Sequence, residues 1–149
     1  MEPLDIRILE ILQEDCTQSP SQIGATIGAP AEEVGARIKR LEDEGIIRKY
    51  VALLDARKLG KDILAFIGVN IGHPRNIEHF EAQIESFKEV AECHHVTGQF
   101  TLVLKVRTRN TDSLEKLIRG IRSIEGVTST YTMVVFSTSR EEMRVSLRD

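Results

Sequence analysis

The sequence predicts an α+β fold in two parts, with three short helices in residues 1–45 and a βαββαβ sandwich in residues 61–149. Apolar residues recur every three or four positions up to Leu41, which is the spacing of amphipathic helices. Beyond Gly60, apolar runs suited to strands alternate with helical stripes. Between the two parts, IIRKYVALLD at 46–55 is expected to form a linker strand within a 46–60 linker, or else an extended connection.

Length and composition allow one domain or two small ones. The chain has 149 residues, 41% of them hydrophobic, and a net charge of -3. Any DNA binding must therefore come from a local basic patch rather than from overall charge. Two cysteines form no disulfide framework, and no apolar run approaches the roughly 18 residues of a membrane span. We expect a cytoplasmic protein that has no membrane partner.

The second helix has the clearest start signal. Ser19 can cap it, Pro20 can take the first helical position, and Gln22 can complete a capping box. Gly28 should end this helix, because glycine enters the left-handed conformation cheaply. Before it, residues 4–14 should form an amphipathic helix.

The third helix should run from Pro30 to Gly45 with Val34, Ile38 and Leu41 as its buried stripe. Three short helices with a glycine-containing turn before the third are typical of a helix-turn-helix, whose third helix enters the DNA major groove. Small side chains at two positions would let it approach base edges closely, and its basic side chains could take guanine or phosphate acceptors. The predicted DNA-binding residues are Glu32, Gly35, Ala36, Arg37, Lys39 and Arg40. The alternative is an ordinary charged, solvated helix face.

The charge balance of this part argues for weak binding by a single copy. Of the six basic residues among the first fifty, five fall within ARIKRLEDEGIIRKY at 36–50, but the same fifty residues carry ten Asp and Glu. Many of these acids lie on the first helix and at its end, which need not face DNA. An assembly that presents several copies would gain affinity through effective concentration.

The second part should be a ferredoxin-like sandwich. The expected strands are 62–71, 89–97, 100–108 and 127–138, the middle two joined at Gly98, and helical stripes follow the first and third strands. The helices of this fold cover one sheet face, yet the first strand is apolar on both faces. A second copy of the chain is the simplest cover for the other face.

Three stretches resemble the Lrp/AsnC, or feast/famine, family of regulators. RIKRLEDEGIIRKYVALLDARKLG at 37–60 is similar to the end of their helix-turn-helix and the connecting strand. LDIRILEIL at 4–12 resembles their opening helix, and VTGQFTLVLKV at 96–106 resembles part of their effector-binding half, the RAM domain. The resemblance implies a sequence-specific DNA-binding transcription regulator, not an enzyme, that assembles as a dimer, tetramer or octamer and needs no cofactor.

The resemblance also implies an effector site for an amino acid or a related small molecule. It would lie between dimers, at the loop after the second sandwich strand, with threonines of the last strand coming from the facing subunit. The residues so implied are Val96, Thr97, Gly98, Gln99, Phe100, Thr101, Thr130 and Thr132.

Two residues depart from the family pattern. Thr101 stands where the family loop usually has an aspartate, and a hydroxyl cannot pair with the ammonium group of an amino acid as a carboxylate can. The effector is therefore expected to be different, weakly bound or absent. Ala29 stands where the third helix would usually have a capping serine or aspartate.

Other functions have weaker sequence support. Cys93, His94 and His95 are adjacent, but neighbouring strand residues point to opposite faces, so the sequence predicts no metal site. One alternative is a DNA-architectural protein without an effector. Another is an enzyme like the tetrapyrrole decarboxylases, which are built on a related two-part fold and have a Trp-containing stretch that this chain lacks.

Overall fold

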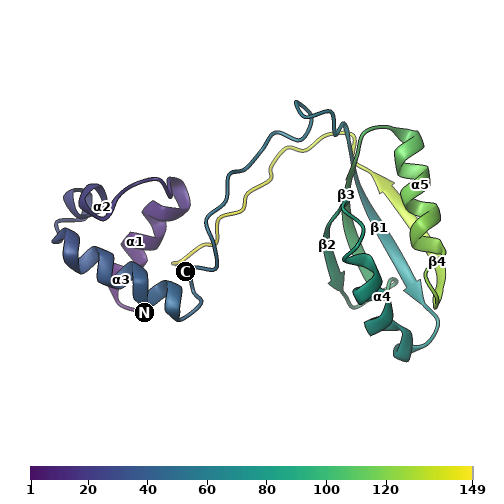
Figure 1. Ribbon diagram of the computed structural model, residues 1–149, viewed down its shortest axis with the longest axis horizontal. Coiled ribbons are helices and arrows are strands. Elements are labelled where there is room, and N and C mark those ends of the chain that lie inside the picture. The colour runs from purple at the N-terminus through teal and green to yellow at the C-terminus, as the bar shows by residue number, and fades with distance from the viewer. Residues whose placement is uncertain (149) are drawn as a thin grey trace. The chain divides into compact units, whose positions relative to one another are not determined.

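A computed structural model describes residues 1–148 and divides the chain into two compact units (Figure 1). The first unit comprises Met1–Leu53 together with the described C-terminal residues from Glu141 onward, and the second comprises Leu54–Arg140. The C-terminal segment thus packs with the N-terminal helices and not with the sandwich, whose predicted range had included it. No helix in residues 1–148 is long and apolar enough to cross a membrane.

The first unit contains the three predicted helices, α1 (Pro3–Glu14), α2 (Pro20–Ile27) and α3 (Ala31–Asp43). They meet around a small core that includes Ile8, Ile23, Ile27 and Val34. The capping box of α2 is confirmed: the Ser19 amide donates to Gln22 Oε1 at 2.7 Å, and the Gln22 amide donates to Ser19 Oγ at 3.2 Å. Gly28 ends the helix with φ of 74°, as predicted.

The start of α3 differs from the expectation. Its N-cap is Pro30, not Ala29, and no side chain caps the free amides there. Ala29 instead belongs to the tight turn, because its carbonyl oxygen lies so near Gly24 that a Cβ on Gly24 would come within 2.4 Å of it. Only glycine at position 24 allows this close approach of the turn to α2.

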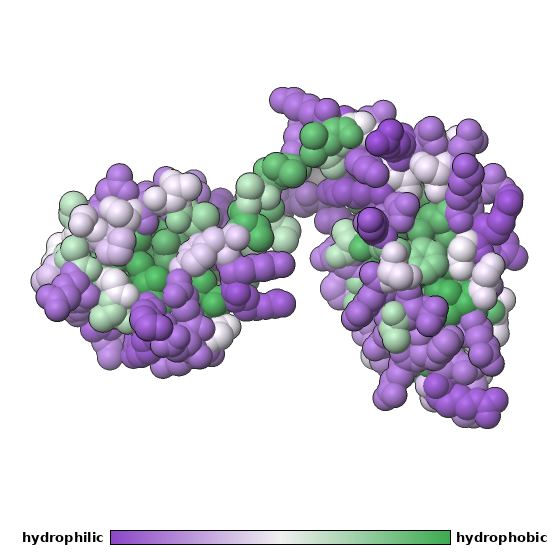
Figure 2. All heavy atoms as spheres, in the orientation of Figure 1, coloured by the Kyte–Doolittle hydropathy of each residue, from purple (hydrophilic) through white to green (hydrophobic). Residues whose placement is uncertain are grey.

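The linker strand expected at 46–55 is not formed in the single chain: the amides of Ile46 and Ile47 donate to the Leu41 carbonyl at the end of α3, and residues 48–55 have no strand pairing. A strand needs a neighbour to accept and donate its backbone hydrogen bonds, and this segment has none among the described residues. Its apolar side chains Val51, Leu53 and Leu54 are exposed, and Figure 2 shows hydrophobic spheres along the connection.

The second unit is the predicted ferredoxin-like βαββαβ sandwich. Its elements are β1 (Ile63–Ile71), the short 3-10 helix η1 (Pro74–Asn76), α4 (Ile77–Ile84), β2 (Val90–His95), β3 (Leu102–Thr108), α5 (Thr111–Arg122) and β4 (Val127–Val134). The strands form one antiparallel sheet in the order β2-β3-β1-β4.

The two faces of this sheet differ. Ile67, Val69 and Leu104 lie on the face that packs with Phe80 of α4 and Ile121 of α5 in one buried core. We call the other side the open face; by strand register it carries Phe66, Gly68, Val103, Tyr131 and Met133. Tyr131 is 61% exposed and Met133 is 40% exposed. The single chain therefore leaves apolar surface uncovered on the open face, as the sequence predicted.

Candidate DNA-binding and effector sites

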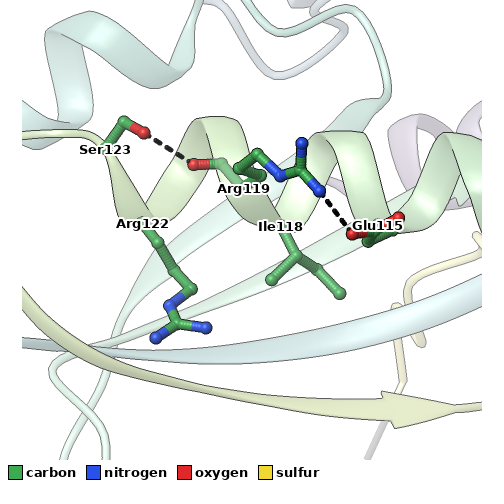
Figure 3. A pocket seen from close by; sticks show the side chains of 5 residues that line it. All are labelled: Glu115, Ile118, Arg119, Arg122 and Ser123. Atoms are coloured by element: carbon green, nitrogen blue, oxygen red, sulfur yellow. Dashed lines mark hydrogen bonds and ion pairs between the residues drawn. The ribbon is translucent and has the colours of Figure 1, made fainter.

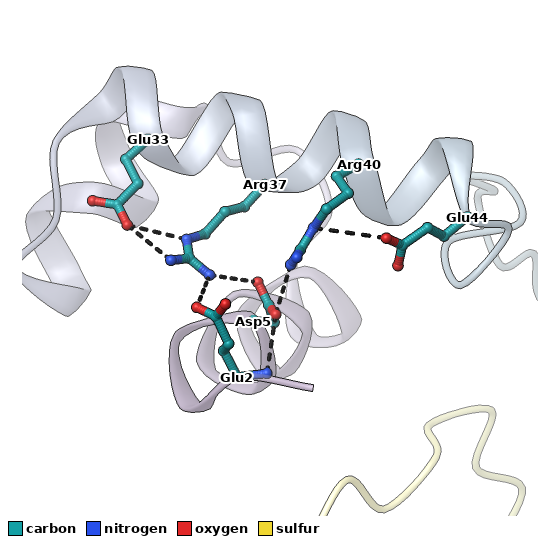
Figure 4. Close-up of polar contacts among 6 residues, drawn as sticks. All are labelled: Glu2, Asp5, Glu33, Arg37, Arg40 and Glu44. Carbon is teal, nitrogen blue, oxygen red and sulfur yellow. Dashed lines mark hydrogen bonds and ion pairs between the residues drawn. The ribbon is translucent and has the colours of Figure 1, made fainter.

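Two arginines of α3 converge on one buried carboxylate of α1, and we call this set the Asp5 cluster (Figure 4). Arg37 Nη1 lies 3.0 Å from Asp5 Oδ1 and 2.7 Å from Glu2 Oε2, while Arg40 Nη2 lies 2.7 Å from Asp5 Oδ2. The Asp5 side chain is only 2% exposed. The Glu2 amide also donates to Asp5 Oδ2, at 3.1 Å. Both carboxylate oxygens therefore accept hydrogen bonds, Oδ1 from Arg37 and Oδ2 from Arg40 and the Glu2 amide.

The charges of the cluster stabilise one another. Burial alone would raise the pKa of Asp5, but the hydrogen bonds from Arg37 and Arg40 outweigh it, and the pKa lies below its ordinary value of 3.8. The pKa of Arg37 is raised, first by its hydrogen bond to Glu2 and then by the one to Asp5. At neutral pH Asp5 is therefore ionised, and the cluster fixes α3 against α1.

The Asp5 cluster changes what the predicted DNA-binding residues can do. The guanidinium groups of Arg37 and Arg40 are turned toward α1, although the Arg40 side chain remains 44% exposed. Lys39 is 74% exposed and pairs with Asp43, one turn away on the same helix, so it can exchange this partner for a phosphate. Glu32 and Ala36 are exposed, while Gly35 is half-buried beside Pro20.

The sequence prediction missed Asp5 and Glu2 as residues that support this site. The available signal was an acidic residue next to Leu4 and one turn before Ile8 and Leu9, inside the apolar stripe of the first helix. A carboxylate that becomes buried needs a cationic partner, and the basic residues of the third helix were candidates because that helix packs in the same unit.

The predicted effector loop connects β2 to β3 and is tied to β1 through Thr101. The Thr101 amide donates to the Val69 carbonyl at 3.0 Å, and its Oγ1 accepts from the Ile71 amide at 3.1 Å. The Val96 amide closes the loop by donating a hydrogen bond to the Thr101 carbonyl at 3.1 Å. Gly98 adopts φ of 109°, a conformation that favours glycine. The Thr101 hydroxyl thus has a structural hydrogen bond of its own.

Phe100 lies on the open face over Gly68. A Cβ at Gly68 would come within 2.6 Å of the Phe100 ring, so the ring occupies the space that a side chain there would need. The same ring stacks on Tyr131, with centroids 5.9 Å apart. Gly68 and Tyr131 were not among the predicted site residues, although the alternation of β1 and β4 places both on the open face.

The predicted threonines of the last strand lie on the other side of the sheet. Thr130 pairs with Val69 and Thr132 with Ile67, so both share the face that α4 and α5 cover. Within one chain the structure brings Phe100 together with Tyr131 and not with these threonines. Their expected contribution across a subunit boundary stays a prediction.

The remaining candidate features hold none of the predicted site residues. A shallow hollow along α5 is lined by Glu115, Ile118, Arg119, Arg122 and Ser123 (Figure 3). Arg119 pairs with Glu115 one turn away, and Ser123 Oγ donates to the Arg119 carbonyl, so three of the five lining residues already have partners within α5 or at its end. Within residues 1–148 no three His, Cys, Asp or Glu side chains are grouped to hold a metal ion.

Known proteins resemble the whole chain. Residues 1–42 match the AsnC-type helix-turn-helix domain, and residues 64–145 match the Lrp/AsnC ligand binding domain. The HTH-type transcriptional regulator FL11 of Pyrococcus furiosus is 31% identical over 148 residues, which cover 99% of this chain and 97% of that protein. The proline dehydrogenase transcriptional activator of Rhizobium radiobacter is 35% identical over 144 residues, 95% of this chain and 92% of the activator.

A solved structure supports the same assignment. A transcriptional regulator from Neisseria meningitidis, in complex with L-Met, is 26% identical and covers 99% of this chain and 97% of its own, with a TM-score of 0.94. These relatives are transcription regulators, so they lend no support to the decarboxylase-like alternative. The resemblance seen in the sequence is confirmed, and the chain belongs to the Lrp/AsnC family of helix-turn-helix transcriptional regulators.

Proposed function

We propose that this regulator acts in the cytoplasm as a homo-oligomer that binds double-stranded DNA through the exposed face of α3. The observation that carries the proposal is the Asp5 cluster, which fixes α3 on α1 and leaves Ala36 and Lys39 exposed. Lys39 would neutralise a phosphate, and the small side chain of Ala36 would let the helix approach base edges. Arg37 and Arg40 would act mainly by orienting the helix.

The test compares Lys39→Ala with Lys116→Ala, a control on the exposed surface of α5. Binding is measured by fluorescence anisotropy at several salt concentrations, on a duplex that the wild-type protein selects from random-sequence DNA. We expect Lys39→Ala to weaken binding and to lower the salt slope by about one, with Lys116→Ala unchanged. If the two variants behave alike, α3 does not hold DNA through Lys39.

Arg40→Ala distinguishes two roles for this side chain, recognition of a DNA base and positioning of α3. If Arg40 reads a guanine, its removal should cost about 1–3 kcal/mol of specific binding free energy and relax the preference at one base, while α3 stays ordered. If Arg40 only orients the helix, the variant should lose DNA affinity together with hydrogen-exchange protection of α1 and α3. Unchanged DNA binding in Arg40→Ala would show that Arg40 does not belong to the DNA-binding site.

Self-association is supported by the exposed apolar residues of the linker and the open face. Met133 and Tyr131 on β4, and Leu53 and Leu54 on the linker, are exposed in the single chain. A second copy would bury these surfaces and give the linker a strand partner. Met133→Glu should therefore lower the mass found by light scattering, whereas Glu115→Gln on α5 should leave it unchanged. A monomeric wild-type protein at micromolar concentration would contradict the proposal.

We further propose that an amino acid or a related small molecule binds at the 96–101 loop, and that DNA binding persists without it. Because Thr101 Oγ1 accepts from the Ile71 amide, an aspartate there could keep this bond with one oxygen and offer the other to an ammonium group. Thr101→Asp should then raise affinity for at least one amino acid roughly tenfold in calorimetry.

Thr101→Asn is the matched control, because it supplies an acceptor without the charge. Micromolar binding by the wild type that is lost in Thr101→Asp would contradict this account and would point to an effector that needs the hydroxyl. Sequence-tolerant, length-dependent DNA binding would instead favour the architectural alternative.

A further inference from the structure

The outer face of α1 carries a second set of polar contacts, made by the C-terminal end of the chain. The side-chain amide of Gln13 donates to the Val145 carbonyl at 3.1 Å, and the Val145 amide donates back to Gln13 Oε1 at 2.7 Å. This reciprocal pair fixes the direction and the register of the C-terminal segment on the helix.

Ion pairs flank this central contact on both sides. Arg144 pairs with Glu14, and Arg148 Nε lies 2.7 Å from Glu10 Oε1. Glu142 also holds Arg144, with Arg144 Nε 3.0 Å from Glu142 Oε1. The pKa of Arg144 is raised, first by its hydrogen bond to Glu142 and then by the charge of Glu14.

The three α1 residues form one stripe. Glu10, Gln13 and Glu14 are spaced i, i+3 and i+4, and at about 100° per residue this stripe lies opposite buried Ile8. Asp5 and Glu2 serve α3 from another side of the same helix. Both the inward and the outward polar residues of α1 therefore have defined partners.

We propose that residues 141–148 are a strap that docks on this stripe and completes the DNA-binding unit. The unit is then built from both ends of the chain, and only six residues, 135–140, separate β4 from the strap. The effector half is thereby joined to the helix-turn-helix in two ways: covalently by the linker, and through residues 135–140, which lead to the non-covalently docked strap. The strap also places two guanidinium groups on carboxylates of α1 that would otherwise repel a phosphate backbone.

The strap itself is tested without reference to DNA, by hydrogen-exchange mass spectrometry on the full chain. Val145→Pro removes the amide that donates to Gln13 and leaves every charge in place. Ser139→Pro is the matched control, because Ser139 is exposed and lies just before the strap. We expect exchange of the α1 peptide and the C-terminal peptide to rise roughly fivefold in Val145→Pro, as for the loss of one ordinary hydrogen bond, and to stay near wild type in Ser139→Pro.

Charge reversal provides the second arm. Arg144→Glu with Arg148→Glu should raise exchange of the same peptides and should do so less at high salt, and adding Glu10→Arg with Glu14→Arg should restore protection. Arg140→Glu, just outside the strap, should have no effect. Equal protection in all variants, or failure of the reversed pairs to restore it, would overturn the strap. Protection that depends on protein concentration would show docking on another copy and would overturn the intrachain form.

The consequence for DNA rests on the proposed function and is measured separately. In Val145→Pro, DNA affinity should fall, up to the same roughly fivefold, with Ser139→Pro unchanged. Loss of protection with unchanged affinity would reject the functional role and keep the strap. A wild-type protein that binds no DNA would reject the proposed function without touching the exchange result.

Discussion

The two units of this regulator are held together by different forces. The sandwich has a broad apolar core in which Phe80, Ile67 and Leu104 are fully buried. The helical unit has a smaller core and adds a buried carboxylate that two arginines share. Apolar burial is insensitive to pH and to moderate salt, whereas ion pairs respond to both. The half that binds DNA should therefore be the half that solution conditions can loosen.

The largest effect should come from the sandwich core. Phe80 lies on the buried face of α4 and is fully buried, and Phe80→Ala should reduce the free energy of unfolding by about 3–5 kcal/mol, through lost burial and a residual cavity. Hydrogen exchange should show the loss in β1, β3 and α5, with α1–α3 little affected. His79→Ala, an exposed neighbour on the same helix, is the control. Equal loosening of both units would mean that they unfold as one.

Asp5→Ala should have the next largest effect, and in the other unit. It leaves two arginines without their buried partner, which should cost about 3 kcal/mol, the low end for a broken buried pair because Arg40 is partly solvated. Exchange should accelerate in α1 and α3 and not in the sheet. Asp5→Asn keeps the shape without the charge, so it divides the loss between packing and electrostatics.

The pH dependence of stability sharpens this comparison. The pKa of Asp5 is lower in the folded state than its ordinary value of 3.8, so its stabilising contribution is present above that value and is lost as pH falls through the folded pKa. Acidification below about pH 4 should therefore loosen α1 and α3 through Asp5 in the wild type. In Asp5→Asn this part of the pH dependence should vanish. An unchanged acid profile would exclude Asp5 as the titrating group.

The sequence predicts the backbone of this molecule better than its polar contacts. Local signals settled the elements: Ser19 and Gln22 gave the start of α2, and alternating apolar residues gave β1 and its two faces. The Asp5 cluster joins residues more than thirty positions apart, and no local pattern states which arginine turns inward. The prediction of a linker strand did not hold in the single chain for a related reason, because strand pairing depends on a neighbour that the single chain does not supply. The C-terminal strap left no periodic signal.

On the open face, Gly68→Ala should have an intermediate effect. The new Cβ would lie 2.6 Å from the Phe100 ring, which must move and give up its stacking on Tyr131. Such overpacking typically costs about 1–3 kcal/mol of unfolding free energy. A second change, Phe100→Ala, should recover most of the strain. If Gly68→Ala alone is neutral in denaturant melts, the ring is mobile enough to yield and does not hold the loop.

The smallest effect should come from the start of α3. Pro30 is the N-cap and offers no side-chain acceptor to the first amides, so Pro30→Ser should supply one, worth about 1 kcal/mol. The same change frees the unfolded backbone, because proline restricts φ, and this should cost about 0.4–1 kcal/mol. The two contributions nearly cancel, and we expect a net change within about 0.5 kcal/mol in denaturant melts. Ala29→Ser should be neutral, because residue 29 precedes the cap. A clear gain from Ala29→Ser alone would mean that in solution α3 begins one residue earlier than its observed N-cap indicates.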